Sequence, residues 1–210
     1  MAEMTMNEII HAAVRRDLAR MEAALRAFPD GDGERARQLE RAWESLWEQL
    51  HHHHETEDAY IWPYVRSLGV LPLGLVDTME AEHVAMAASM GEATAAVGAL
   101  VEDPSAEVAA RAVDRVAEAA RVTDAHLVHE ERDVMPTVVE RRDTPEWKAV
   151  EKQLRKGSLV RAGRMFAWLQ DGADARILAS LRESFPPPVL FLLGRVLGRS
   201  YHRDVAPVWR

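Results

Sequence analysis

Apolar and polar positions along this chain follow helical spacing, and the alternation typical of β-strands is missing. Met79, Met86 and Met90, for example, fall on one face of a helix. Alanine, leucine, glutamate and arginine, which favour helices, dominate the composition, and few glycines lie inside the segments. Pattern and propensity together predict an all-α protein.

Clusters of helix-breaking residues divide the first 143 residues into four long segments. The breaks fall at residues 29–33, 68–74 and 103–105, so the predicted helices cover residues 7–28, 34–66, 77–102 and 106–141. Within the second helix, Pro63 is expected to bend or end the helix. Four long helices with short connections predict an up-down-up-down four-helix bundle for residues 1–143.

The remaining residues, 144–210, differ in character, and we expect a helical C-terminal extension packed on the bundle. Pro186, Pro187 and Pro188 introduce the apolar run of residues 189–193, which is too short to span a bilayer. We expect this part of the chain to complete the core. A lid that controls access to a buried site is the alternative.

The composition of the chain argues against several kinds of site and partner. The 210 residues include no cysteine, which excludes disulfides, thiolate metal ligands and a cysteine nucleophile. The formal charge is −8, with both signs interspersed and no basic tail, so we expect no nucleic-acid partner. Residues 1–6 show no leader pattern, and no segment approaches about 18 uninterrupted apolar residues. We therefore expect a cytoplasmic protein with no membrane partner.

Two stretches, residues 53–63 and 126–136, share one chemical layout: a His, a Glu four residues later, and a Pro six residues after that. Residues four apart lie on one face of a helix, so each stretch presents an imidazole and a carboxylate in the same direction. A Glu-x-x-His pair precedes each stretch at nearly the same offset, at Glu8 with His11 and at Glu80 with His83. The chain is therefore interpreted as a duplicated helical hairpin.

Two such hairpins converging in a bundle would form a dinuclear metal site. Imidazoles mixed with carboxylates suit iron, manganese or zinc better than calcium or magnesium. Aligning the two stretches on their prolines selects His53 from the run of four histidines, and leaves His51, His52 and His54 as flanking residues. The candidate ligands are His11, His53, Glu57, His83, His126 and Glu130.

These motifs, taken in order over residues 7–142, resemble the hemerythrin-like or HHE cation-binding domains. The resemblance implies a left-handed four-helix bundle that holds two iron ions with an oxo or hydroxo bridge; manganese or zinc are alternatives. It implies that Glu57 and Glu130 bridge the ions and that His11, His53, His83 and His126 complete their coordination. The implied partners are dioxygen, peroxide or nitric oxide, and iron sensing is a further possibility.

One position departs from the family pattern. Oxygen-carrying members have a second His one turn after the ligand of the third helix, and that position here is Ala87. Glu80, one turn before His83, or a water would then complete the site, and Glu8 repeats the arrangement beside His11. The alternative is that both are helix-start carboxylates, with Glu80 in a capping box headed by Asp77.

The function expected from these residues is a non-haem di-iron protein that binds or reacts with dioxygen, peroxide or nitric oxide. Peroxidase-like, catalase-like or oxygenase turnover is compatible with this set of residues. Two alternatives are kept: a metal- or oxygen-responsive regulator or iron sensor without turnover, and a di-iron oxygenase acting on a small organic substrate.

Overall fold

The computed structural model describes residues 4–210, and this range contains helices and no strand. The all-α prediction is confirmed. Residues 1–3, which belong to the predicted bundle unit and to the N-terminal segment without a leader pattern, lie outside the described residues.

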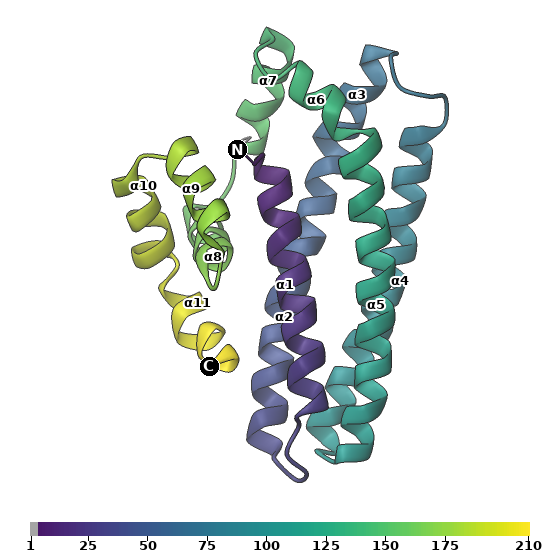
Figure 1. Ribbon diagram of the computed structural model, residues 1–210, viewed down its shortest axis with the longest axis vertical. Helices are drawn as coiled ribbons and strands as arrows, with labels where there is room; N and C mark the ends of the chain where they lie inside the picture. Colours follow the sequence, from purple (N-terminus) through teal and green to yellow (C-terminus); the bar gives the residue numbers. More distant parts are fainter. Residues whose placement is uncertain (1–3) are drawn as a thin grey trace.

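Four long helices lie side by side along the long axis of the molecule (Figure 1): α1 (Met6–Arg26), α2 (Gly33–Thr56), α4 (Leu75–Glu102) and α5 (Ala106–Asp133). The α1–α2 and α4–α5 connections meet at one end, where the Gly31 N–H donates to the Pro104 carbonyl at 2.7 Å. The connection from α3 (Trp62–Leu68) to α4 lies at the opposite end (Figure 1). Consecutive long helices therefore run in opposite directions.

Side-chain caps explain where most of these helices begin. The Thr5 hydroxyl accepts from the Glu8 N–H, and the Glu8 carboxylate accepts from the Thr5 N–H at 2.7 Å, which completes a capping box. Asp32 and Ser105 cap α2 and α5 in the same way. The capping box predicted at Asp77 is wrong, because α4 begins two residues earlier, after Gly74.

The core runs the length of the bundle, with a smaller cluster at the α3–α4 end. Met86 and Met90 of α4 are fully buried in the main core, and Trp62 is fully buried in the smaller cluster with Met79 and Trp147. By length and composition alone, α4 is long and apolar enough to cross a membrane, although its apolar residues are interrupted by polar ones. In this structure α4 is one of the four bundle helices.

After α5 the chain continues in shorter helical segments: α6 (Met135–Glu140), α7 (Pro145–Leu154), α8 (Leu159–Gln170), α9 (Ala175–Ser184), α10 (Pro187–Phe191), the π-helical η2 (Leu192–Leu197), α11 (Arg199–Asp204) and the 3₁₀ segment η3 (Ala206–Trp209). The Trp168 indole N–H of α8 donates to the buried Asp17 carboxylate of α1 at 2.8 Å. The Arg16 guanidinium donates to the Trp168 carbonyl at 3.1 Å. These bonds hold α8 against α1.

The C-terminal part of the chain adds buried residues such as Phe166 and Trp168 to the main core, as expected, but most of the apolar run at residues 189–193 stays outside it. Leu190 is buried, but Val189, Phe191 and Leu192 are exposed. In Figure 1, α10 lies at the outer edge of the molecule, with α8 between it and the bundle. Leu190 thus joins the main core, while the rest of the run is kept away from the bundle by α8.

Candidate metal centre

Inside the bundle the six predicted residues come together and form two groups with a seventh, His54. The first group is His11, His53, Glu57 and Glu130, and the second is His54, Glu57, His83 and His126. Within each group, one nitrogen or oxygen atom from every residue lies within 4.8 Å of the others. Glu57 belongs to both groups, and Glu130 belongs to the first alone.

The first group has the spacing of ligands around one ion. The His11 Nε2 atom lies 3.2 Å from the His53 Nε2 atom and 3.2 Å from the Glu130 Oε2 atom. The His53 Nε2 atom lies 3.1 Å from the Glu57 Oε1 atom. Two ligands that bind an ion at about 2.1 Å and at right angles are themselves about 3.0 Å apart. The three spacings therefore match neighbouring positions in one coordination sphere.

The second group is built around imidazoles. The His83 Nε2 atom lies 3.1 Å from the His126 Nε2 atom and 3.6 Å from the Glu57 Oε2 atom. The His54 ring stacks on the His83 ring with centroids 4.2 Å apart. Buried in this group, the His54 Nε2 atom has no hydrogen-bond partner among the residues that the structure describes. In the tautomer protonated at Nδ1, the lone pair of this atom would be available to a cation.

Carboxylates behind three of the imidazoles orient them. The Nδ1 atoms of His11, His83 and His126 lie 2.8, 2.8 and 2.9 Å from carboxylate oxygens of Glu131, Asp58 and Glu82, respectively. Each carboxylate accepts the Nδ1–H, so the tautomer assigned from this network leaves the Nε2 lone pair facing the group interior. This arrangement is characteristic of histidines that bind metals.

Sequence reasoning missed these three carboxylates, although a signal was present. Asp58 and Glu131 directly follow the candidate ligands Glu57 and Glu130, and Glu82 directly precedes His83. An acid next to a ligand on a helix is displaced by about 100° around the axis, so it reaches a neighbouring helix rather than the same ion.

Burial sets the charge states of the cluster. Burial, together with the neighbouring His11, lowers the pKa of His53 to about 3, and burial lowers the pKa of His54 well below its ordinary value. These imidazoles are neutral, which is the form that binds metals. Burial and the adjacent Glu130 raise the pKa of the Glu57 carboxyl. Although burial opposes its ionisation, the adjacent His11 lowers the pKa of Glu130 to about 2.

Three buried polar atoms in the cluster have no hydrogen-bond partner among the described residues. The Oε2 atoms of Glu57 and Glu130 are buried and form no hydrogen bond with any described residue, like the Nε2 atom of His54. Buried polar atoms are nearly always paired, and an unpaired one costs about 1–3 kcal/mol. Cations bound between these atoms would satisfy all three, so the residues present fit a metal pair.

A local widening of the helix positions Glu57. After α2 ends at Thr56, residues Glu57–Ile61 form the π-helical segment η1, in which the Trp62 N–H donates to the Glu57 carbonyl. Pro63 has no N–H and would clash with the carbonyl four residues back in a regular helix. The wider turn avoids that clash, and such turns are frequent at functional sites. Pro63 therefore changes the helix geometry about one turn before its own position, at the candidate ligand Glu57.

The two additional candidates, Glu8 and Glu80, lie outside both groups. Glu8 is engaged in the capping box of α1. The Glu80 carboxylate accepts from the Arg66 guanidinium at 2.9 Å and is 44% exposed. Ala87 is exposed on α4, so the position that carries a ligand in oxygen carriers does not face the cluster here. The additional imidazole next to His83 and His126 belongs to His54 instead.

The interpretation of the four-histidine run is corrected at one residue. His51 and His52 are exposed and lie near Glu55, in keeping with their expected flanking role. His54 was placed with them, but it is 6% exposed and belongs to the second group. Alignment on the prolines selects only one histidine of the run. Whether its neighbour also faces the bundle interior depends on how α2 is rotated about its axis against the other helices.

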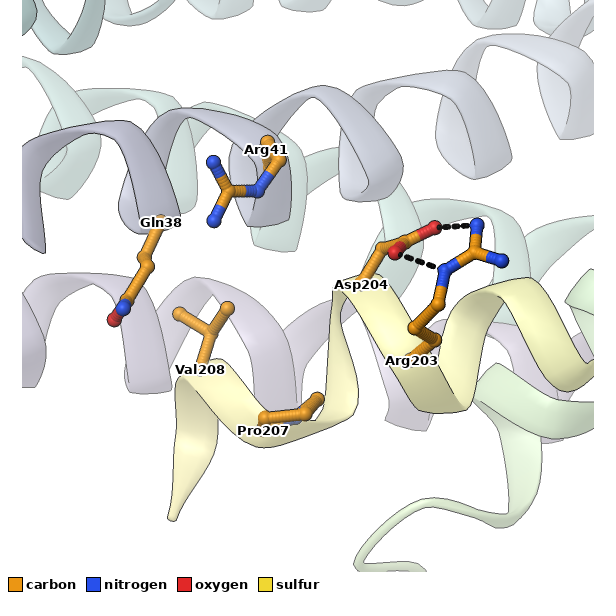
Figure 2. A pocket seen from close by; sticks show the side chains of 6 residues that line it. All are labelled: Gln38, Arg41, Arg203, Asp204, Pro207 and Val208. Atoms are coloured by element: carbon orange, nitrogen blue, oxygen red, sulfur yellow. Dashed lines mark hydrogen bonds and ion pairs between the residues drawn. The ribbon is translucent and has the colours of Figure 1, made fainter. Parts of the chain in front are cut away.

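A hollow on the surface lies apart from this cluster. Figure 2 shows its lining residues, which come from α2 and the C-terminal end of the chain: Gln38, Arg41, Arg203, Asp204, Pro207 and Val208. Arg203 and Asp204 are joined by two hydrogen bonds of 2.7 Å. None of these residues belongs to either group, so this hollow is not a substrate pocket beside the candidate metal centre.

Comparison with known proteins adds one finding. The family model described as the hemerythrin HHE cation-binding domain matches residues 9–138, a range that contains every residue of both groups. No curated protein and no solved structure matches the chain.

Proposed function

The chain belongs to the hemerythrin HHE cation-binding family, and from that premise we propose that its two ligand groups bind a pair of iron ions that react with dioxygen, peroxide or nitric oxide. The observation that carries the proposal is the position of Glu57. Its Oε1 atom lies 3.1 Å from His53 in the first group, and its Oε2 atom lies 3.6 Å from His83 in the second. A carboxylate shared in this way favours two adjacent ions over a single one.

The donor set supports iron, with manganese or zinc as alternatives. The first group offers two imidazoles and two carboxylates, and the second offers three imidazoles and the shared carboxylate. Mixed nitrogen and oxygen donors suit all three metals better than calcium or magnesium. Two bound irons would supply the electrons and the exchangeable coordination positions that reactions of small oxygen species require.

The protein's own contribution is orientation and exclusion of water. Glu131, which orients His11, is itself held by two hydrogen bonds from Arg15, at 2.7 and 3.2 Å. On the other side of the cluster, the fully buried Trp62 ring lies 5.8 Å from the His83 ring, measured between centroids. A fixed imidazole and an apolar wall control both ligand geometry and solvent access.

The test begins with protein purified without a histidine tag. Elemental analysis is expected to find two iron ions per chain, and the optical spectrum is expected to change on reduction. The iron-loaded protein should then consume added peroxide. A single metal per chain, whatever its identity, would contradict the paired site.

A second candidate, a metal-responsive regulator without turnover, is favoured by one observation. Helix α1 carries both the candidate ligand His11 and Asp17, whose buried carboxylate accepts from Trp168 of α8. Binding of metal at His11 could therefore change the packing of α8, because both involve α1. If this candidate is correct, metal changes the fluorescence of Trp168 while peroxide is not consumed, which separates it from the first.

A further inference from the structure

The outer side of α10 and η2 exposes a stripe of apolar side chains. Val189, Phe191, Leu192 and Val196 are 39, 64, 50 and 46% exposed. Positions 189, 192 and 196 recur at helical spacing, while Leu190 and Gly194 turn inward. In Figure 1 this segment lies at the outer edge of the molecule, and among the described residues 4–210 no helix lies beyond it.

Two cations flank the stripe. Arg195 and Arg199 are exposed, and neither guanidinium forms a hydrogen bond or ion pair with a residue in the described range 4–210. This contrasts with Arg203 on the next turn, which is paired with Asp204. The segment from residue 184 to residue 203 contains no acidic residue, although the whole chain carries a net charge of −8.

The charge of the chain is divided unevenly. Residues 144–210 contain 12 basic and 6 acidic side chains, whereas residues 1–143 contain 14 basic and 28 acidic ones. The C-terminal part is therefore cationic and the bundle strongly anionic. An anionic surface would attract the molecule with its C-terminal part foremost and repel the bundle.

We propose that residues 189–199 of α10 and η2, here called the outer face, bind the surface of a bilayer that contains anionic phospholipid. Apolar side chains flanked by arginines are the composition of helices that lie in a membrane interface. Phe191 and Leu192 enter the boundary between headgroups and acyl chains, while Arg195 and Arg199 contact the phosphates. The segment is too short to span the bilayer, so the attachment is peripheral, and the proposal departs from the expectation of no membrane partner.

A second copy of the chain is a poorer occupant of this face. Four partly exposed side chains offer on the order of a few hundred Å² of apolar surface. A stable dimer buries about 800 Å² on each partner. A twofold contact through the stripe would also bring Arg195 and Arg199 of both copies close together, without acidic residues to balance them.

The test is sedimentation of the full chain with two kinds of vesicle, phosphatidylcholine alone and phosphatidylcholine with about one third phosphatidylglycerol. Binding is expected to the anionic vesicles, and it should weaken at high salt because the charges are screened. The double replacement Arg195→Gln/Arg199→Gln should weaken binding about 30-fold. Phe191→Ser/Leu192→Ser should weaken it about tenfold or more.

Matched controls remove the same groups elsewhere. Val84→Ser/Val128→Ser replaces exposed apolar residues of the bundle, and Arg111→Gln/Arg115→Gln removes two bundle charges. Both controls should bind vesicles as the unaltered protein does. The proposal is overturned if the two vesicles bind equally, if neither binds, or if the controls weaken binding as much as the outer-face variants. It is also overturned if light scattering finds a dimer that Phe191→Ser/Leu192→Ser dissociates, because the face is then an interface between copies.

Discussion

Glu57 is the residue on which both ligand groups depend, since its two oxygens face different groups. Replacing Glu57 with Ala should reduce the metal content from two ions per chain to less than one. The bundle should still fold, because the change removes a buried carboxyl whose Oε2 atom has no partner in the described structure. Elemental analysis measures the content, and circular dichroism checks the fold.

The control for Glu57 is His51→Ala, at an exposed imidazole on the preceding helix α2. It should leave metal content unchanged. Two ions retained in the Glu57 variant would show that the shared carboxylate is not a ligand.

His54 leads to a second prediction at this scale. His54→Ala should lower the content to about one ion per chain, because the second group loses one of its three imidazoles while the first stays complete. Titration of the metal-free protein with ferrous or cobalt ion would measure the two affinities separately. Ala87→His is the comparison variant, and because that position is exposed it should not change loading. Equal loading in the His54 variant and the unaltered protein would place His54 outside the site.

Most of the cluster was predictable from sequence at the level of residues. His53 with Glu57, and His126 with Glu130, were found because residues four apart share a helix face. His54 was not, because helical periodicity alone does not say which of two adjacent residues faces the interior. That depends on how α2 is rotated against its neighbours, and the run of histidines contains no apolar residue to indicate it.

At the scale of elements, the crossing of α8 and η2 depends on a glycine. A Cβ atom at Gly163 would overlap the Leu197 side chain and lie 2.6 Å from the Leu197 carbonyl carbon. Gly163→Ala should therefore destabilise the protein by about 1–3 kcal/mol, through displacement of η2 from α8. Denaturant unfolding followed by tryptophan fluorescence measures the change.

Gly91 of α4 provides the matched control, because no atom of the described residues, apart from the local helix backbone, lies within 4 Å of a Cβ atom placed there. Gly91→Ala should stabilise the helix by about 0.5–1 kcal/mol. If the two variants shift stability in the same direction, close packing at Gly163 is not the cause.

Helix boundaries show where the sequence analysis reached its limit. The second predicted helix, residues 34–66, is divided into α2, η1 and α3. The π-helical turn before Pro63 causes this division, and no local sequence pattern predicts such a turn. The apolar run at residues 189–193 was assigned to the core, and only Leu190 and, in part, Leu193 are sheltered there. Whether an apolar face is covered depends on which elements reach it, and that is a property of the tertiary structure.

For the whole molecule, metal should act as a fold stabiliser. The two ligand groups draw on α1, α2, α4, α5 and η1, and the Oε2 atoms of Glu57 and Glu130 have no hydrogen-bond partner in the described structure. A ligand present at about 100 times its dissociation constant stabilises by about 2.7 kcal/mol. For a domain of this size that corresponds to about 5–10 °C in Tm.

Thermal unfolding before and after chelation measures this effect, and ferrous iron should restore the original midpoint. In the Glu57→Ala variant the midpoint should not respond to either treatment. An unchanged midpoint in the unaltered protein, with metal loss verified by elemental analysis, would mean that the bundle is fully preformed and the site adds little to stability.

His54 also breaks the internal symmetry of the duplicated hairpins. When the two hairpins are aligned on their prolines, His53 matches His126, and the counterpart of His54 is Leu127, which is fully buried. A perfectly repeated sequence would give the two ions equivalent surroundings, but this one gives three imidazoles to one group and two to the other. If each group binds an iron ion, the electric field gradients at the two nuclei should differ. Mössbauer spectra of ⁵⁷Fe-loaded protein should therefore contain two quadrupole doublets of equal area, and His54→Ala should remove or shift one of them while the other stays in place.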